Sequence, residues 1–362
     1  MNKRTVNCDL LKGDILNKTE LNSLTLEESK VYMMNIGEKG YRGEQLFQYF
    51  NKHLNLNLNE LKQLPKETRN KLKEVGKVNE IEILERFDSK IDSTKKYLYL
   101  LDDKNIVESV LMEYKHGFTT CISTQVGCKM GCTFCASTKN GFIRDLTPAE
   151  MLNQIYMMEK DNNIKINNIV LMGSGEPLDN YDNTLKFINI IHEEKGHNIS
   201  LRNITLSSCG VVPKIYDLAK ENLPITLSIS LHSPFDAKRA KIMPIAKRYS
   251  INELMNACKF YGDSTNRRLT FEYTLIEDEN DGEKEAIELA KLLKNINAHI
   301  NLIPLNSIKE FSKDRPDKKS IEKFKDSLEK KGLRVTIRRE MGSDISASCG
   351  QLRRSYLENK LQ

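Results

Sequence analysis

Four cysteines in the stretch CISTQVGCKMGCTFC have a type and spacing that could support metal chemistry. Cys128, Cys132 and Cys135 form a C-x3-C-x2-C pattern, with Phe134 before the last cysteine, and Cys121 lies seven residues upstream. Three thiolates can bind three irons of a 4Fe-4S cluster, whereas protein-held clusters normally use four cysteines. The pattern therefore predicts a cluster with one open iron, to which a substrate or cofactor can bind.

A structural zinc site is the alternative for the same residues. All-cysteine zinc sites are common and tetrahedral, and Cys121 would then be the fourth ligand. Such sites usually combine two short C-x2-4-C pairs, and the spacing from Cys121 to Cys135 departs from that pattern. The cysteines alone favour the cluster and leave zinc open.

Size and composition restrict the class of protein. A chain of 362 residues can form one large domain with a smaller one. The net charge of +6 is compatible with an RNA partner, but many enzymes that bind no nucleic acid are equally basic. We find no apolar run of membrane-spanning length and no secretory signal, so we expect a cytoplasmic protein without membrane association. Eight cysteines in such a chain indicate metal or catalytic thiols.

The first part of the chain predicts a small helical unit followed by strands. Helical spacing covers residues 24–36 and 43–53, and Pro65 introduces a third helix at 67–75. Residues 79–114 alternate with period two and predict a short antiparallel meander. The expected divisions are a helical unit at 1–75, a β-rich linker at 76–115, a catalytic core at 116–350 and a tail at 351–362.

Strand-like and helical patterns alternate after residue 119. The strand-like runs are TTCISTQV, INNIVLMG, RNITLSS, ITLSISLH, RLTFEYTLI and HINLIPLN. Thr147, Pro148 and Glu150 predict a helix start with an N-cap, a proline at N1 and a capping-box glutamate. Further helical segments are expected at 185–194, 213–222, 251–260, 284–296 and 321–331. This βα repeat predicts an α/β fold with a parallel sheet, whose ligands bind at the C-terminal ends of the strands.

Glycines and polar residues fall at these expected strand ends. Gly173-Ser174-Gly175-Glu176-Pro177 follows one strand, and its glycines permit close approach of the backbone to a ligand. A third glycine and a helix start are missing, which argues against a dinucleotide-binding motif. The residues at the other expected strand ends are Ser207, Ser230, Leu231, His232 and Asn306. Taken singly, such residues are commonly turn or capping residues, but their recurrence in phase with the repeat predicts a binding site.

The cysteine pattern with its Phe134 resembles the signature of the radical S-adenosylmethionine (SAM) enzymes. In that family the open iron chelates SAM, and the reduced cluster cleaves SAM to a 5′-deoxyadenosyl radical. VGCKMGCTFCAST, followed by GFIRDLT at 141–147, narrows the resemblance to the adenine-C2 RNA methyltransferases, the ribosomal RNA large subunit methyltransferase N family. The resemblance covers residues 20–355 and implies a partial (β/α)6 radical SAM barrel behind an RNA-associated N-terminal domain.

The resemblance also implies roles for the residues of the site. Gly175 and Glu176 match the residues that receive the methionine amino group of SAM, and the other strand-end residues complete the SAM pocket. Glu108, in a strand-like run 13 residues before Cys121, matches a proton acceptor. Ser174 and Ser348 stand where the family pattern has methionine and alanine, and a serine rather than a proline follows Asn306.

Cys349 lies in the sequence GSDISASCGQL, which resembles the family motif whose cysteine is methylated during turnover. C2 of adenine lies between two ring nitrogens and is too electron-poor to attack a sulfonium methyl group, whereas a thiolate can do so. The resemblance implies two SAM molecules per turnover, one that methylates Cys349 and one that supplies the radical. Cys121 would help to resolve the RNA–protein adduct, leaving a transient Cys121–Cys349 disulfide.

The resemblance implies as substrates an adenosine of 23S rRNA and the adenosine 3′ to the tRNA anticodon. A monomer served by an electron donor such as flavodoxin is expected. The C8 methyltransferases of the same family, which confer antibiotic resistance, tend to have alanine where this chain has Pro177. A non-catalytic, zinc-stabilised RNA-binding protein is the alternative from another class, and the Cys349 motif argues against it. A phosphate-contacting patch, or a solvated charged face, is expected at Lys238, Arg239, Lys241, Lys247 and Arg248.

Overall fold

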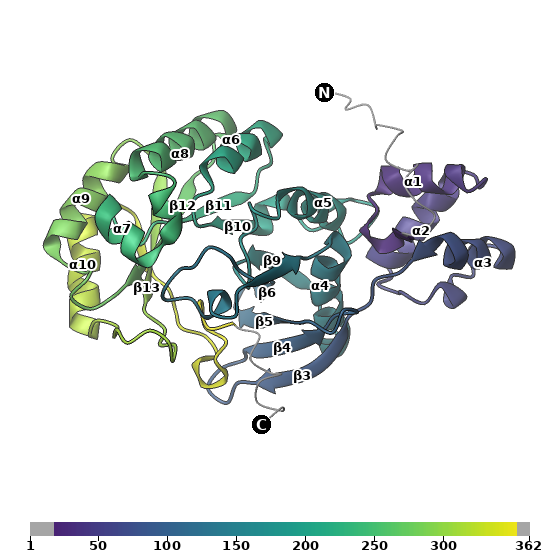
Figure 1. Cartoon of the computed structure of the whole chain (residues 1–362), viewed down its shortest axis with the longest axis horizontal. Helices are drawn as coiled ribbons and strands as arrows, with labels where there is room; N and C mark the ends of the chain where they lie inside the picture. The colour runs from purple at the N-terminus through teal and green to yellow at the C-terminus, as the bar shows by residue number, and fades with distance from the viewer. Residues whose placement is uncertain (1–17, 353–362) are drawn as a thin grey trace.

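The computed structural model shows a small helical domain beside a large α/β domain built on one sheet of ten strands (Figure 1). It describes residues 18–352. Residues 1–17 and 353–362, which include the start of the expected helical unit and almost all of the expected tail, lie outside the described residues. None of the described helices is both long and apolar enough to cross a membrane.

The N-terminal domain contains the three expected helices. They are α1 (Leu26–Asn35), α2 (Tyr41–Asn51) and α3 (Lys66–Val75). Thr25 and Glu28 form a capping box at the start of α1, which satisfies backbone N–H groups that the helix leaves free. A short parallel pair, β1 (Thr19–Glu20) and β2 (Gly76–Lys77), joins the two ends of the domain. The domain has its own core, which includes Leu21, Met33, Leu46, Phe50, Leu61 and Leu72.

Buried hydrogen bonds connect this domain to α4 (Pro148–Asn162) of the large domain. The Tyr156 hydroxyl donates to Asn51 Oδ1 (3.0 Å), and Asn153 Nδ2 donates to the Asn79 carbonyl (2.9 Å). Because buried polar groups are costly to leave unpaired, these contacts favour one relative position of the two domains.

The expected meander is present and continues the sheet of the large domain. Strands β3 (Glu82–Asp88), β4 (Lys95–Leu100), β5 (Ile106–Tyr114) and β6 (Gly117–Cys121) are antiparallel neighbours. Strand β6 then pairs in parallel with β9 (Ile166–Leu171). The residues expected to form a linker therefore share hydrogen bonds with the core.

The parallel part of the sheet confirms the partial barrel. From β6 and β9 it continues through β10 (Ile204–Ser208), β11 (Thr226–Ser230), β12 (Leu269–Leu275), β13 (Ala298–Pro304) and β14 (Val335–Ile337). Every residue of β12 is buried, as expected for a central strand covered on both faces. The sequence patterns did not predict β14, which has only three residues.

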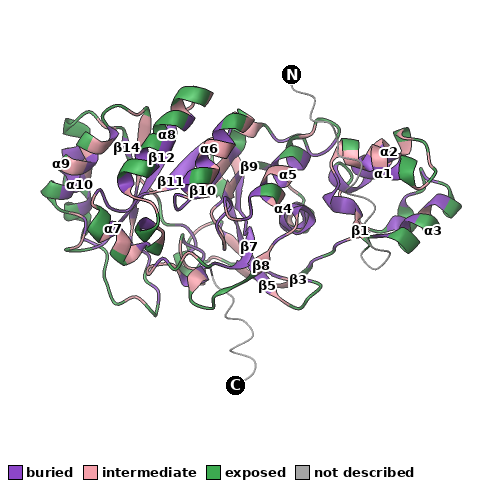
Figure 2. Ribbon diagram, turned by 45° about the horizontal axis from the view of Figure 1, so that its top comes forward, coloured by how far each residue is buried: buried purple, intermediate pink, exposed green. Residues whose placement is uncertain are grey.

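Helices cover the outer face of these strands, and Figure 2 shows their exposed residues directed away from the buried sheet. Thr147 caps α4, and Glu150 completes the predicted capping box. The other predicted helices are α5 (Tyr181–His192), α6 (Val212–Glu221), α8 (Ile251–Thr265), α9 (Glu283–Leu293) and α10 (Lys318–Lys330). A further short helix, α7 (Asp236–Ile242), was not predicted because its sequence is dominated by charged residues.

A substitution at Gly43 tests the packing between α1 and α2. A Cβ at this position would overlap the backbone of α1 at Ser29 and Lys30, so the helices would have to separate. We expect Gly43→Ala to lower the free energy of unfolding by about 1–3 kcal/mol, as overpacking does. Urea unfolding followed by circular dichroism measures this. The control is Gly40→Ala, whose Cβ would come no closer than 3.5 Å to Met34 Sδ. Equal stability of the two variants would contradict the close helix contact.

Candidate active site

The cysteine loop begins and ends at a small antiparallel hairpin. Strands β7 (Gln125–Gly127) and β8 (Phe142–Asp145) pair on either side of it. Gly127 has φ +74°, and a Cβ there would overlap the Gly141 carbonyl, so only glycine fits where the two strands meet. Across the loop, the Thr133 N–H donates to the Ile242 carbonyl at the end of α7 (2.9 Å). The hairpin and α7 therefore hold the loop from two sides.

Cys128, Cys132 and Cys135 line one cavity of about 910 Å³. Burial raises the pKa of all three thiols, that of Cys128 to about 12, and repulsion between neighbouring thiolates contributes for Cys128 and Cys132. Such a site disfavours free thiolates, whereas iron ions bind them and reverse that preference. Two buried thiols and one half-buried thiol on one cavity wall fit a 4Fe-4S cluster held by three cysteines.

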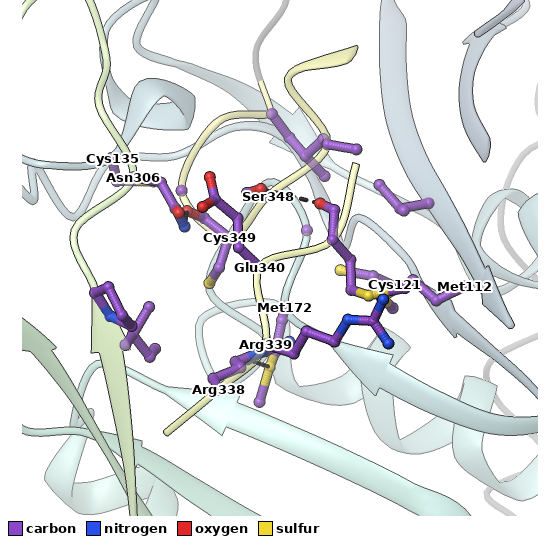
Figure 3. Close-up of a pocket in the computed structure, with 18 of the residues that line it drawn as sticks. Met112, Cys121, Cys135, Met172, Asn306, Arg338, Arg339, Glu340, Ser348 and Cys349 are labelled. Carbon is purple, nitrogen blue, oxygen red and sulfur yellow. Dashed lines mark hydrogen bonds between the residues drawn. The ribbon is translucent and has the colours of Figure 1, made fainter. Parts of the chain in front are cut away.

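Cys121 lies elsewhere, at the end of β6. It packs with Val110, Met112 and Met341 and lines a second cavity of about 700 Å³ (Figure 3). Of the three motif cysteines only Cys135 also lines this second cavity. Cys121 thus shares a cavity with only one of the three motif cysteines, which argues against the four-cysteine zinc site.

Cys349 is exposed and lines both cavities. Its carbonyl accepts a hydrogen bond from Asn306 Nδ2 (2.9 Å), and the next carbonyl, of Gly350, accepts from the Ala136 N–H (2.7 Å). The structure thus brings together Cys349, Cys121 and the cysteine loop. All seven described cysteines are free thiols, so the transient Cys121–Cys349 disulfide stays a prediction.

Gly175 and Glu176 lie at the same cavity as the three motif cysteines, after the end of β9. Gly175 has φ +109°, and a Cβ there would lie 2.7 Å from Thr124 Oγ1, so its backbone requires glycine. The Glu176 carboxylate is buried and accepts hydrogen bonds from the N–H groups of Cys209 (2.7 Å) and Leu178 (3.0 Å). Burial raises the pKa of Glu176. A carboxylate fixed in this way can accept hydrogen bonds from an amino group.

Four of the other five residues predicted for the SAM pocket line this cavity as well. They are Ser207, Ser230, His232 and Asn306. His232 Nδ1 accepts from the Thr274 N–H (2.9 Å), and burial lowers the His232 pKa to about 3, so the ring is neutral. Leu231 is fully buried and does not line the cavity, although its backbone lies between two residues that do.

Comparison with known proteins agrees with this geometry. The family model of the radical SAM superfamily matches residues 122–290, and that of the ribosomal RNA large subunit methyltransferase N-terminal domain matches residues 19–78. The probable dual-specificity RNA methyltransferase RlmN of Clostridioides difficile (strain 630) is 52% identical over 339 residues, 94% of this chain and 98% of that protein. The chain belongs to the RlmN family of radical SAM RNA methyltransferases.

Other relatives give the same assignment. The probable RlmN enzyme of Alkaliphilus metalliredigens (strain QYMF) is 51% identical, over 95% of this chain and 98% of that protein. The crystal structure of a radical SAM methyltransferase from Sphaerobacter thermophilus has a TM-score of 0.88 and 38% identity, covering 92% of this chain and 99% of that one. Both family domains are thus present in one chain.

Glu108 is buried, with 5% of its surface exposed, on the same face of β5 as Val110 and Met112. Those two residues line the cavity that contains Cys121 and Cys349, whereas Glu108 lines a smaller neighbouring cavity of about 290 Å³. Ser137 belongs to the walls of both. The structure therefore places Glu108 in a cavity that shares a wall residue with the cavity of Cys121 and Cys349, and not in that cavity itself.

Two charged residues that the sequence patterns did not single out line the site. Glu272 on β12 is 3% exposed, and its Oε1 accepts from Ser228 Oγ (2.8 Å) and Asn301 Nδ2 (3.1 Å). Its Oε2 lies 3.9 Å from Arg338 Nη1, and Arg338 lines both cavities. Glu272 could have been predicted as a site residue, because it is a carboxylate in an otherwise largely apolar strand. No sequence signal pointed to Arg338, because the strand before it, β14, was not predicted.

The expected phosphate-contacting patch does not include Arg239, which is buried. It is 1% exposed, and its guanidinium donates to the carbonyls of Leu231 (3.1 Å), Cys209 (2.7 Å) and Ser230 (3.2 Å). The prediction of a surface role for Arg239 is wrong because α7 turns this side chain inward, beneath the ends of β10 and β11. Lys238 is paired with Glu285 (2.6 Å), whereas Lys241, Lys247 and Arg248 are exposed.

The pH dependence of Cys121 follows from its burial. Burial raises the pKa of Cys121 to about 12, and the neighbouring Cys349 adds to the shift. The folded thiol stays protonated where the unfolded thiol ionises, so its contribution to stability is present at neutral pH and decreases as the pH rises from about 9 to 12.

We therefore expect alkylation of Cys121 by iodoacetamide to accelerate about tenfold per pH unit from pH 7 to pH 10, because only the thiolate reacts. Peptide mass spectrometry of apoprotein after timed alkylation measures the rate. A plateau near the usual thiol pKa of about 8.5 would show that the site does not disfavour the thiolate.

Proposed function

We propose that this enzyme methylates C2 of an adenosine in 23S rRNA and of the adenosine 3′ to the anticodon in tRNA, with Cys349 as the methyl carrier. One observation carries the proposal: Cys349 lines both the cavity with the three motif cysteines and the cavity with Cys121. A thiol in this position can accept a methyl group on one side and meet a second thiol on the other.

The residues of the first cavity would bind and orient the cofactors. When bound by Cys128, Cys132 and Cys135, a 4Fe-4S cluster with an open iron supplies the electron that cleaves SAM to a 5′-deoxyadenosyl radical. Glu176 would accept hydrogen bonds from the amino group of SAM, and the fixed backbone of Gly175 admits the ligand close to the strand end. Ser207, Ser230, Leu231, His232 and Asn306 would complete the pocket, Leu231 through its backbone.

Cys349 would take part in two successive steps. Its thiolate first attacks the methyl carbon of one SAM molecule, which leaves as S-adenosylhomocysteine and gives methylated Cys349. The methyl group then loses a hydrogen atom to the radical from a second SAM molecule, and its carbon adds to C2 of adenine. RNA and protein are then joined through the sulfur of Cys349.

Glu108 and Cys121 would release the product. Glu108 takes the hydrogen of C2 as a proton, and the unpaired electron of the adduct would return to the oxidised cluster, which leaves a closed-shell thioether. Cys121 attacks the sulfur of Cys349, so a disulfide forms, and the electron pair of the broken sulfur–carbon bond stays on the carbon, which is protonated to methyl. An external reductant restores the two thiols.

The partners follow from this chemistry. The cluster needs a one-electron donor such as flavodoxin, and the RNA substrates indicate action in the cytoplasm. All residues assigned above come from one chain, so we infer that a monomer is sufficient for activity.

Replacement of Cys349 tests the methyl carrier. We expect Cys349→Ala to abolish formation of 2-methyladenosine, because the proposed methyl carrier is then missing. The measurement is nucleoside mass spectrometry after reaction of iron-reconstituted protein with SAM, reductant and unmodified rRNA or tRNA. Cys258→Ala, which removes a fully buried thiol of α8, is the matched control and should retain activity. A product methylated at C8, or activity in Cys349→Ala, would overturn the proposal.

Replacement of the other cysteines tests cluster binding. Alanine at Cys128, Cys132 or Cys135 should lower bound iron severalfold, since each thiolate would hold one iron. Cys209→Ala should keep its iron, although Cys209 is a buried thiol of the same cavity. Iron analysis and electron paramagnetic resonance after anaerobic reconstitution decide between three and four thiolate ligands. A comparable loss of iron in Cys209→Ala would show that the three-cysteine assignment is wrong.

A further inference from the structure

The segment that follows Cys349 is attached to the cysteine loop by two hydrogen bonds. The Gly350 carbonyl accepts from the Ala136 N–H (2.7 Å), and the Leu352 carbonyl accepts from Ser137 Oγ (2.8 Å). Ala136 and Ser137 begin the short helical turn η4 (Ala136–Thr138), directly after Cys135. The methyl-accepting segment is therefore attached to the residues next to a proposed cluster ligand.

Ser137 also contacts a third segment. Its hydroxyl accepts from Ser174 Oγ (3.1 Å), and Ser174 lies between Gly173 and Gly175, which line the proposed SAM cavity. The Ser174 N–H donates to Ser123 Oγ (3.0 Å), and the Ser174 carbonyl accepts from the Thr124 N–H (2.8 Å), so Ser174 is itself held firmly. The buried Ser137 hydroxyl thus joins the cysteine loop, the SAM-binding glycines and the Cys349 segment.

The segment before Cys349 is closed by separate contacts. Ser348 Oγ donates to the Met341 carbonyl (2.9 Å), and the Ala347 N–H donates to the Gly342 carbonyl (2.9 Å). Asn306 Nδ2 then holds the carbonyl of Cys349 itself. Cys349 therefore lies between a closed loop on one side and the Ser137 attachment on the other, with its side chain exposed to the cavities.

We infer that Ser137 is a positioning residue, which sets the position of the Cys349 thiol relative to the cysteine loop and the SAM-binding glycines. This inference rests on the proposed function, in which Cys349 must lie in line with a sulfonium methyl group and later beside a radical. In both steps the sulfur of Cys349 must lie at a defined position relative to SAM. A displacement of about 1 Å can lower a rate on the order of 100-fold. Ser137 itself touches no reacting atom in this scheme.

The test is Ser137→Ala in the full chain with its cluster reconstituted. We expect amide hydrogen exchange of residues 347–352 to accelerate about tenfold, because the hydrogen bond from the hydroxyl to the Leu352 carbonyl is lost. Methylation of Cys349 in the absence of RNA, measured by peptide mass spectrometry, should fall on the order of 10- to 100-fold. Iron content and the affinity for SAM should match those of the unaltered protein.

Two further variants make the result specific. Ser137→Thr keeps the hydroxyl at a position that borders two cavities, so it should restore both exchange protection and methylation. Ser327→Ala removes a serine hydroxyl of α10 that donates to Glu283 (2.7 Å), far along the chain from the site, and should change neither measurement.

Two results would overturn the inference. One is normal exchange and normal Cys349 methylation in Ser137→Ala. The other is a changed cluster potential or iron content with unchanged exchange, which would mean that Ser137 acts on the cluster through Cys135. If Cys349 is not methylated in the unaltered protein, the proposed function fails, and the hydrogen exchange alone then decides whether Ser137 holds the segment.

Discussion

The parallel alignment of β6 and β9 through β13 is the constraint on which the site depends. Parallel pairing directs the C-terminal ends of all these strands to one edge of the sheet. Cys121, Glu176, Ser207, Ser230 and Asn306 come from five different strand ends, and the shared edge brings them to the two adjoining cavities. A one-residue shift of any strand would turn its side chains to the opposite face of the sheet, so the ladder hydrogen bonds also determine the composition of the site.

A sheet edge that encloses a ligand site leaves carbonyl groups without ladder partners, and the protein has to satisfy them in other ways. Arg239 does so from α7, where its buried guanidinium donates to three carbonyls at the ends of β10 and β11. A guanidinium suits this position because its donors are fixed in one plane and it stays charged when buried. The carbonyl groups at the ends of these strands are therefore paired within the protein itself.

The fold was largely predictable from the sequence because its signals are local. The capping box of Thr147 and Glu150 and the period-two runs before Cys121 each involve residues a few positions apart, and the structure confirms both. Where the signal was weak or misleading, the prediction failed. Strand β14 is too short to show a period, and the charged residues of α7 suggested a surface where one of them, Arg239, is buried.

The sequence by itself determined the three-cysteine motif, the family and the βα order, because these depend on residue types and on spacings along the chain. Only the tertiary structure decided that Cys121 lies outside the cavity that the three motif cysteines share, that Leu231 is buried away from it and that Arg338, beside Glu272, lines both cavities. Cys349 likewise reaches the cysteine loop only through hydrogen bonds between residues far apart in the chain. Such contacts arise from packing and strand register, which no spacing within a single segment encodes.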